Sequence, residues 1–170
     1  NINSLPIITN CTFTGNSASF AGGGIANLDG SNPLIRNSIV WGNGTQIANN
    51  LTYLTGGGGA TVIYSIVQGG YAGTGNLSTD PLFLNAANPA GPDGIHRTAD
   101  DGLRLNLCLP GSPAINAGTA TGAPSTDIIG TSRPQFAGID IGAYESTIDY
   151  IVPPTAGISG STTGCGSVTL

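Results

Sequence analysis

The chain has 170 residues and a net charge of −5, with four Arg, no Lys and only nine Asp and Glu residues. It therefore offers no basic surface for a phosphate backbone, which excludes nucleic acid as an expected partner. The 28 Gly and 11 Pro residues disfavour long helices, and no run approaches the roughly 18 apolar residues of a membrane span.

A short phrase recurs three times at a spacing of 27 residues, which aligns Pro6 with Pro33 and Ala60. Its consensus is Pro-x-Ile-x-Asn-(Cys/Ser)-x-(Phe/Val)-x-Gly-Asn. A fixed period of this length indicates a solenoid, because a single repeat cannot bury its apolar face without a stacked neighbour. The Leu-x-x-Leu-x-Leu pattern of a leucine-rich array is absent.

Within the phrase, the alternation of apolar and polar residues breaks at Asn10. Asn tolerates a left-handed backbone, so this break fits a strand that turns a corner. We expect Asn10 and Asn37 to stack as a short ladder inside the bend. The pattern predicts an all-β parallel β-helix, with three coils over residues 1–79.

The simple period ends at residue 80. Residues 84–102 are rich in Pro, Gly and Asp and predict an inserted loop. Apolar strand patterns return over 103–146, which we interpret as a last coil and a C-terminal cap, since a cap would cover the open strand edges. The second unit is thus 80–150. Residues 151–170 are a linker followed by either the start of a further β-sandwich module or a disordered tail.

Two sets of motifs resemble known families. Residues 13–16 (Phe-Thr-Gly-Asn) and 22–25 (Gly-Gly-Gly-Ile) resemble the repeats of polymorphic outer-membrane adhesins. Four further motifs resemble the end of a choice-of-anchor β-helix domain. They are Asp-Pro-Leu-Phe at 80–83, Leu-Arg-Leu at 103–105, Gly-Ser-Pro-Ala-Ile-Asn-Ala-Gly at 111–118 and Asp-Ile-Gly-Ala-Tyr-Glu at 140–145.

These resemblances imply a right-handed parallel β-helix (solenoid) with a C-terminal cap, attached to the bacterial envelope by a C-terminal anchor. The tail from Pro153 resembles the immunoglobulin-like β-sandwich modules that follow such domains in large Bacteroidetes surface proteins. The implied location is extracellular or on the bacterial cell surface at the outer membrane, with export by type IX secretion.

The loop supplies the candidate metal site. Asp93, Asp100 and Asp101 hold a third of the acidic residues within nine positions, and Ca²⁺ prefers carboxylate and carbonyl oxygens. The spacing excludes an EF-hand. Either these residues bind calcium, or their side chains cap backbone amides in Asx turns. The single histidine, His96, is expected to be an exposed loop residue.

Two observations bear on catalysis. Asp140 and Glu145 offer the two carboxylates of a glycosidase, but we prefer the interpretation that Arg133 pairs with a carboxylate and fastens the cap. Asp140 is expected to face away from its isoleucine neighbours. A β-helix lyase would need charged residues along one outward strip. Here the outward strips are neutral or apolar apart from Arg36: Thr9, Arg36 and Ile63, or Thr12, Ile39 and Ile66. Trp41, Tyr53, Tyr64 and Tyr71 either stack on sugars or pack at coil edges.

The sequence thus predicts a non-catalytic structural and adhesive segment of a large secreted or surface protein. It would be a stiff rod whose loops, including 43–59 and 84–102, contact surface glycans or other cell-surface proteins, beside further domains of the same chain. One alternative is a carbohydrate-active β-helix enzyme, a polysaccharide lyase or hydrolase, whose site lies in other coils. A second alternative is a filament or spacer subunit.

Overall fold

The computed structural model describes residues 1–51, 58–108 and 110–147. Within these ranges the protein is all-β, and no helix is present that could cross a membrane. The β-sandwich module predicted within 151–170 lies outside the described residues. The strands are β1 (Ile7–Thr9), β2 (Thr12–Thr14), β3 (Ile25–Leu28), β4 (Leu34–Arg36), β5 (Ile39–Trp41), β6 (Ile47–Leu51), β7 (Thr61–Ile63) and β8 (Ile66–Val67).

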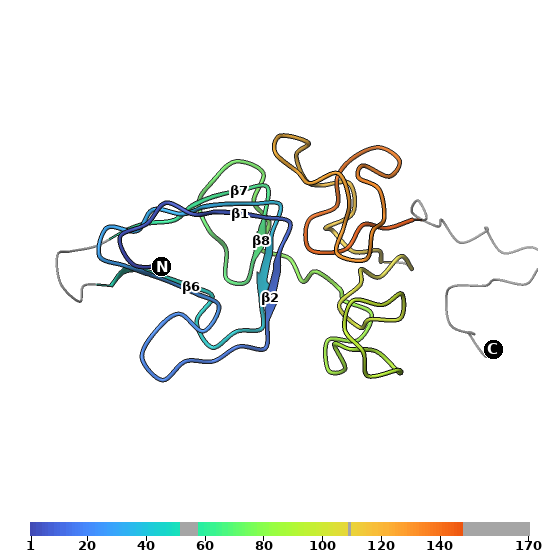
Figure 1. The fold of residues 1–170 in the computed structure, drawn as a ribbon, viewed down its shortest axis with the longest axis horizontal. Coiled ribbons are helices and arrows are strands. Elements are labelled where there is room, and N and C mark those ends of the chain that lie inside the picture. Colours follow the sequence, from blue (N-terminus) through green and yellow to red (C-terminus); the bar gives the residue numbers. More distant parts are fainter. Residues whose placement is uncertain (52–57, 109, 148–170) are drawn as a thin grey trace, which may run out of the picture.

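These strands form three parallel sheets, ordered β1-β4-β7, β2-β5-β8 and β3-β6. Each sheet takes its strands from successive repeats. Ile8 pairs with Ile35, and Ile35 pairs with Val62. Paired residues are therefore separated by 27 positions in the sequence, which is the period of the repeat. The third sheet differs, because Ile25 pairs with Ile47, only 22 residues later. The sheets surround one interior, and the stacked strands overlie one another in Figure 1.

The predicted asparagine corner is confirmed. Asn10 and Asn37 have φ values of 50° and 48°, and Tyr64 takes the same left-handed conformation in the third repeat with φ 46°. The Asn37 side-chain amide donates a hydrogen bond to Asn10 Oδ1 at 3.2 Å. Asparagine is suited to this corner because it tolerates positive φ and its amide can both donate and accept.

Apolar side chains from all three sheets fill the interior. Ile35 and Val40 are fully buried there, and Val62 and Val67 are 1% exposed. Ile8 and Phe13 of the first repeat pack against this cluster but are only half-buried. The inward positions of the phrase therefore form one continuous core, as expected for stacked repeats.

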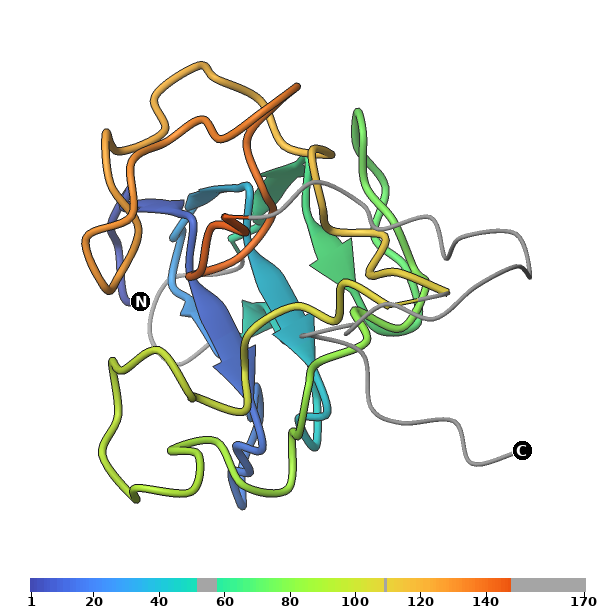
Figure 2. The ribbon, with the colours of Figure 1, turned by 90° about the vertical axis from the view of Figure 1, so that its right-hand side faces the viewer.

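A second apolar cluster lies on the outer face of the β2-β5-β8 sheet. Ile39 and Ile66 point outward from the repeats, but both are fully buried because Leu105, Ala114 and Ile141 cover them. The C-terminal region, residues 80–147, lies beside the repeats against this face (Figures 1 and 2).

The last coil and C-terminal cap expected for 103–146 stay a prediction. Among the described residues beyond Val67, only isolated bridges occur, such as the antiparallel pair of Phe83 and Leu105. The apolar strip of the repeats accounts for the position of this region. Ile39 and Ile66 were expected to face solvent, and burying them against the C-terminal region removes that apolar surface from water.

The edge of the third repeat is covered by the residues that follow it. Leu77 pairs with Ile66 in parallel, and its carbonyl accepts a hydrogen bond from Val67 N–H at 3.0 Å. Tyr64 N–H donates to the carbonyl of Thr74 at 2.8 Å. The two ends of the stack are therefore unlike.

Candidate functional site

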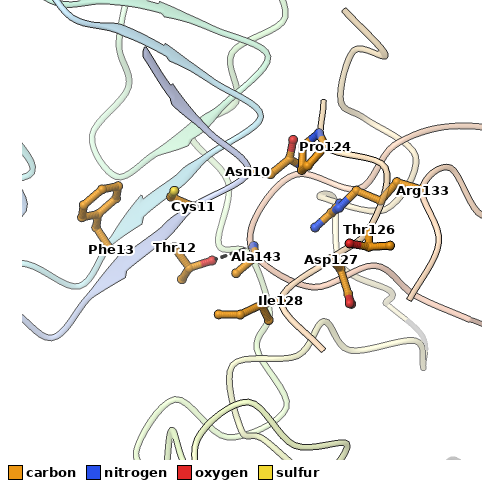
Figure 3. Close-up of a pocket in the computed structure, with 10 residues that line it drawn as sticks. All are labelled: Asn10, Cys11, Thr12, Phe13, Pro124, Thr126, Asp127, Ile128, Arg133 and Ala143. Atoms are coloured by element: carbon orange, nitrogen blue, oxygen red, sulfur yellow. Dashed lines mark hydrogen bonds between the residues drawn. The ribbon is translucent and has the colours of Figure 1, made fainter. Parts of the chain in front are cut away.

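A cavity of about 450 Å³ lies between β2 and the loops of the C-terminal region (Figure 3). We call it the edge cavity. Its lining residues come from both regions: Asn10, Cys11, Thr12, Phe13, Pro124, Thr126, Asp127, Ile128, Arg133 and Ala143. Successive side chains of a strand point to opposite faces, yet both faces of β2 line the cavity. It therefore runs along the edge of β2 that no other described strand pairs with.

Hydrogen bonds hold the two walls of the edge cavity together. Thr12 Oγ1 accepts the N–H of Ala143 at 3.2 Å, the bond drawn in Figure 3. The Asn10 side-chain amide donates to the carbonyl of Asp140 at 3.0 Å. These bonds attach the C-terminal region to the corner and strand of the first repeat.

Cys11 is a free thiol in the wall of this cavity. Burial raises its pKa, and its Sγ donates to the carbonyl of Thr9 at 3.3 Å. The thiol is therefore protonated near neutral pH, and a protonated thiol is a poor nucleophile. The chemistry of Cys11 is that of a small, partly exposed apolar group.

Arg133, one of the lining residues, forms a buried ion pair, which confirms the interpretation that it pairs with a carboxylate. The Nη1 atom of Arg133 is 2.5 Å from Glu145 Oε2, and the two side chains are 1% and 0% exposed. Arg133 also donates to the carbonyls of Asp140 and Gly142 at 3.2 and 3.0 Å. Burial raises the pKa of Glu145 and lowers the pKa of Arg133, since it disfavours both charges.

The nearby carboxylates accept backbone amides. Asp140 accepts hydrogen bonds from the N–H groups of Asn116 at 2.8 Å and Ser146 at 2.7 Å, and Asp127 accepts one from the N–H of Glu145 at 2.9 Å. Asp140 and Glu145 are 2% and 3% exposed. Asp140 and its neighbours Ile139 and Ile141 are all buried, so the expectation that Asp140 faces away from them stays a prediction. These acids fasten loops that have no strand partners.

The predicted metal residues all lie in one loop, and their carboxylates also accept hydrogen bonds. Asp93 Oδ1 accepts the N–H of Ile95 at 2.7 Å, and Asp100 Oδ1 accepts the Thr98 hydroxyl at 2.7 Å. Both acids are exposed. In the ranges that the structure describes, no three His, Cys, Asp or Glu residues form a group that could hold a metal ion. These carboxylates thus accept hydrogen bonds within the loop, as in the amide-capping alternative, and calcium binding stays a prediction.

Asp101 is the buried member of the three and ties the loop to Tyr144, elsewhere in the C-terminal region. Its Oδ2 accepts the N–H groups of Arg97 and Thr98 at 2.6 and 3.0 Å, and also the Tyr144 hydroxyl. Burial alone would raise the pKa of Asp101, but these hydrogen bonds outweigh it and lower the pKa. His96 is exposed in the same loop, as expected.

The aromatic residues proposed for sugar stacking have structural contacts. Tyr71 packs against the interior, and its hydroxyl accepts from Asn49 at 2.6 Å and donates to the carbonyl of Ala60 at 3.0 Å. Trp41 packs on the second cluster. Tyr53 lies outside the described residues. The packing alternative therefore holds for Trp41 and Tyr71.

No motif in the sequence predicts the edge cavity. Pro124 and Ile128 come from a segment without a recognisable motif, and Cys11 resembled an ordinary core residue. One sequence feature does indicate a covered face. Isoleucine at the outward position of two successive repeats, Ile39 and Ile66, is a costly surface unless another part of the chain covers it.

No family model, curated protein or solved structure matches this chain. The resemblance to choice-of-anchor β-helix domains and to polymorphic outer-membrane repeats therefore stays a prediction from the motifs.

Proposed function

We propose that this chain is a non-catalytic structural and adhesive segment of a large exported bacterial surface protein. In this proposal the parallel sheets belong to a right-handed parallel β-helix that acts as a stiff rod and presents loops for contact. The observation that carries the proposal is the in-register stacking of repeats 27 residues apart.

Side chains as well as backbone hold the repeats together. Cys11 N–H donates to Ser38 Oγ at 3.2 Å, and Ser38 N–H donates to Ser65 Oγ at 3.1 Å. The same polar link thus repeats from one layer to the next inside the corner. Such ladders oppose sliding between layers, because a shift would leave buried amides without acceptors.

The loop at 84–102 is the candidate contact element. Its base is closed by backbone bonds from Leu84 to Arg104 at 2.9 Å and from Asn85 to Gly102 at 2.8 Å. Leu84 and Ile95 are 53% and 61% exposed. A fixed base that presents apolar groups suits contact with a surface glycan or a cell-surface protein.

Binding of the immobilised chain to arrayed glycans and to bacterial or host surface proteins tests the adhesive role. We expect Ile95→Ser to weaken the binding of any captured partner. The control is Phe136→Ser, at another exposed apolar residue (54%), which should leave binding unchanged. Equal loss in both variants, or capture of no glycan or protein, would overturn adhesion through this loop.

Two further assays address the alternatives. Release of oligosaccharides from uronate polysaccharides by the purified chain would overturn the non-catalytic proposal in favour of a lyase or hydrolase. For calcium, the capping geometry leads us to expect no heat of binding in a calorimetric titration. Uptake that is lost in Asp93→Asn would instead establish a site at Asp93, Asp100 and Asp101.

A further inference from the structure

The interior core is closed at one end of the stack and open at the other. Ile35 and Val40 of the second repeat are fully buried, whereas the equivalent Ile8 and Phe13 of the first repeat are half-buried. The third-repeat end is covered by the segment that carries Leu77. The same inward positions therefore lose their exposure only where another layer lies over them.

Exposed apolar residues also gather on the first repeat. Leu5 and Ile7 are 74% and 64% exposed, and Ile2 is 62% exposed. The β1 and β2 strands are the outermost members of their sheets, so each has one edge without a described partner. An open strand edge beside apolar side chains is a surface on which another strand can add.

On the third side of the stack, residues 1–3 already show how a further layer would sit. Ile2 forms a parallel bridge with Leu28. The Asn1 side-chain amide donates to Asn27 Oδ1 at 3.0 Å, and Asn27 donates in the same way to Asn49 Oδ1 at 2.7 Å. Asn1 thus continues a side-chain ladder that runs through the layers below it.

We infer that the free edges of β1 and β2 bind a further repeat of the same 27-residue pattern, stacked parallel and in the register that joins β1 to β4. The inference rests on the proposed solenoid but not on its adhesive role. Its template is the interface between the first and second repeats. The further repeat adds to the first-repeat end of the stack, because the segment that carries Leu77 covers the third-repeat end.

The edge cavity has the position that this added layer requires. The outward column runs from Ile66 to Ile39 to Thr12, with steps of 27 residues. Continuing it by one layer brings an outward side chain into the cavity, beside Ile128. Cys11 occupies the place where Ser38 and Ser65 accept an N–H from the preceding repeat, so an added layer would cover the Cys11 thiol.

The test inserts a second copy of residues 4–30 between Asn3 and Ser4 of the full chain. We expect amide exchange at Ile7 and Thr12 of the original repeat to slow by about tenfold or more, as for amides that gain a strand partner. A control insert of equal length carries Ile8→Pro and Phe13→Ser in the copy alone. The proline removes a backbone N–H that donates to the neighbouring strand, and the serine removes an aromatic side chain from the interior. Equal exchange with both inserts would overturn the inference.

A second measurement does not depend on the folding of the insertion. A synthetic peptide of residues 4–30 with Cys11→Ser is added to the unmodified chain, and alkylation of Cys11 is followed by mass spectrometry. We expect saturable protection, and none from a peptide that also carries Ile8→Pro. Absence of protection would contradict the docking. Protection that grows with the concentration of the unmodified chain alone would assign the edge to a second copy and also overturn the inference.

Discussion

The repeats and the C-terminal region satisfy their backbone groups in different ways. In the repeats, the partner of a strand residue lies 27 positions away on two sheets, and the same side chains recur at each step. In residues 80–147, the backbone bonds follow no common spacing, and buried carboxylates such as Asp140, Asp127 and Glu145 also accept amides from other loops. The repeats rely on many equivalent hydrogen bonds, whereas the irregular region also depends on a few buried charges.

This difference predicts where single substitutions are most damaging. Arg133→Ala should lower the free energy of unfolding by about 3–5 kcal/mol, because it leaves the buried Glu145 carboxylate without its cation. Thermal unfolding followed by circular dichroism measures the loss. Arg97→Ala, at an exposed loop arginine, should change stability by less than about 0.5 kcal/mol. A comparable effect of the two substitutions would contradict the comparison between the regions.

Within the repeats, the cost should follow the layer rather than the residue type. Ile35→Ala should destabilise the fold by about 2–5 kcal/mol, since it opens a cavity in the core. Ile8→Ala removes the same atoms from the half-buried, equivalent position of the first repeat, so its cost should be distinctly smaller. Urea unfolding of both variants measures the difference, and equal losses would mean that the first-repeat end is not open.

The corner joins the two regions, because Asn37 bonds to both. Its side chain accepts Thr119 N–H at 2.8 Å and donates to the Thr119 carbonyl at 2.7 Å and to Asn10 Oδ1. Asn37→Ala should cost about 1–3 kcal/mol for the unpaired groups and about 1–2 kcal/mol for the left-handed backbone. Asn37→Gly keeps the conformation and should lose only the first part. The gap between the two melting curves isolates the backbone contribution.

The smallest expected effect concerns acid. The folded-state pKa of Asp101 is lowered, so its stabilisation is present above its ordinary pKa of about 3.9 and is lost as pH falls through the folded value. Tyr144→Phe removes one donor to Asp101 and should cost about 1.5–3 kcal/mol at neutral pH. It should also reduce the further loss of unfolding free energy between about pH 4 and pH 2, because the Asp101 pKa would then be closer to its ordinary value. Unfolding is measured across this range for both proteins, and an equal acid loss in the variant and the unmodified chain would mean that the bond is unimportant.

The parts that could be predicted are those governed by repetition. The period, the pairing of Ile8 with Ile35 and the ladder of Asn10 and Asn37 follow from local residue preferences repeated in each layer. The packing of residues 103–147 could not be predicted, because it depends on which face of the repeats the segment covers. The apolar pattern around Leu105 and Ile141 shows only that they are buried, and a last coil would bury them equally well.

The edge cavity escaped prediction for a related reason. It is formed by β2 together with a loop more than a hundred residues later, and its shape depends on the Arg133 network behind that loop. Charges at Asp127, Asp140 and Glu145 are visible in the sequence, but their roles depend on amides supplied by other loops. The sequence therefore indicates that Arg133 pairs with a carboxylate, but it does not indicate that this ion pair supports the loops around the edge cavity.

The corners of the repeats differ in how much change they can absorb. Two residues separate β1 from β2, β4 from β5 and β7 from β8, and the side-chain ladder fixes that number. At the next corner, β2 and β3 are joined by residues 15–24, but β5 and β6 only by 42–46, and this difference accounts for the shorter spacing of the third sheet. Evolution can therefore lengthen or shorten that connection without disturbing the layers. Foreign peptide sequences grafted between β2 and β3 should be displayed at its tip, where Phe20 is already 83% exposed.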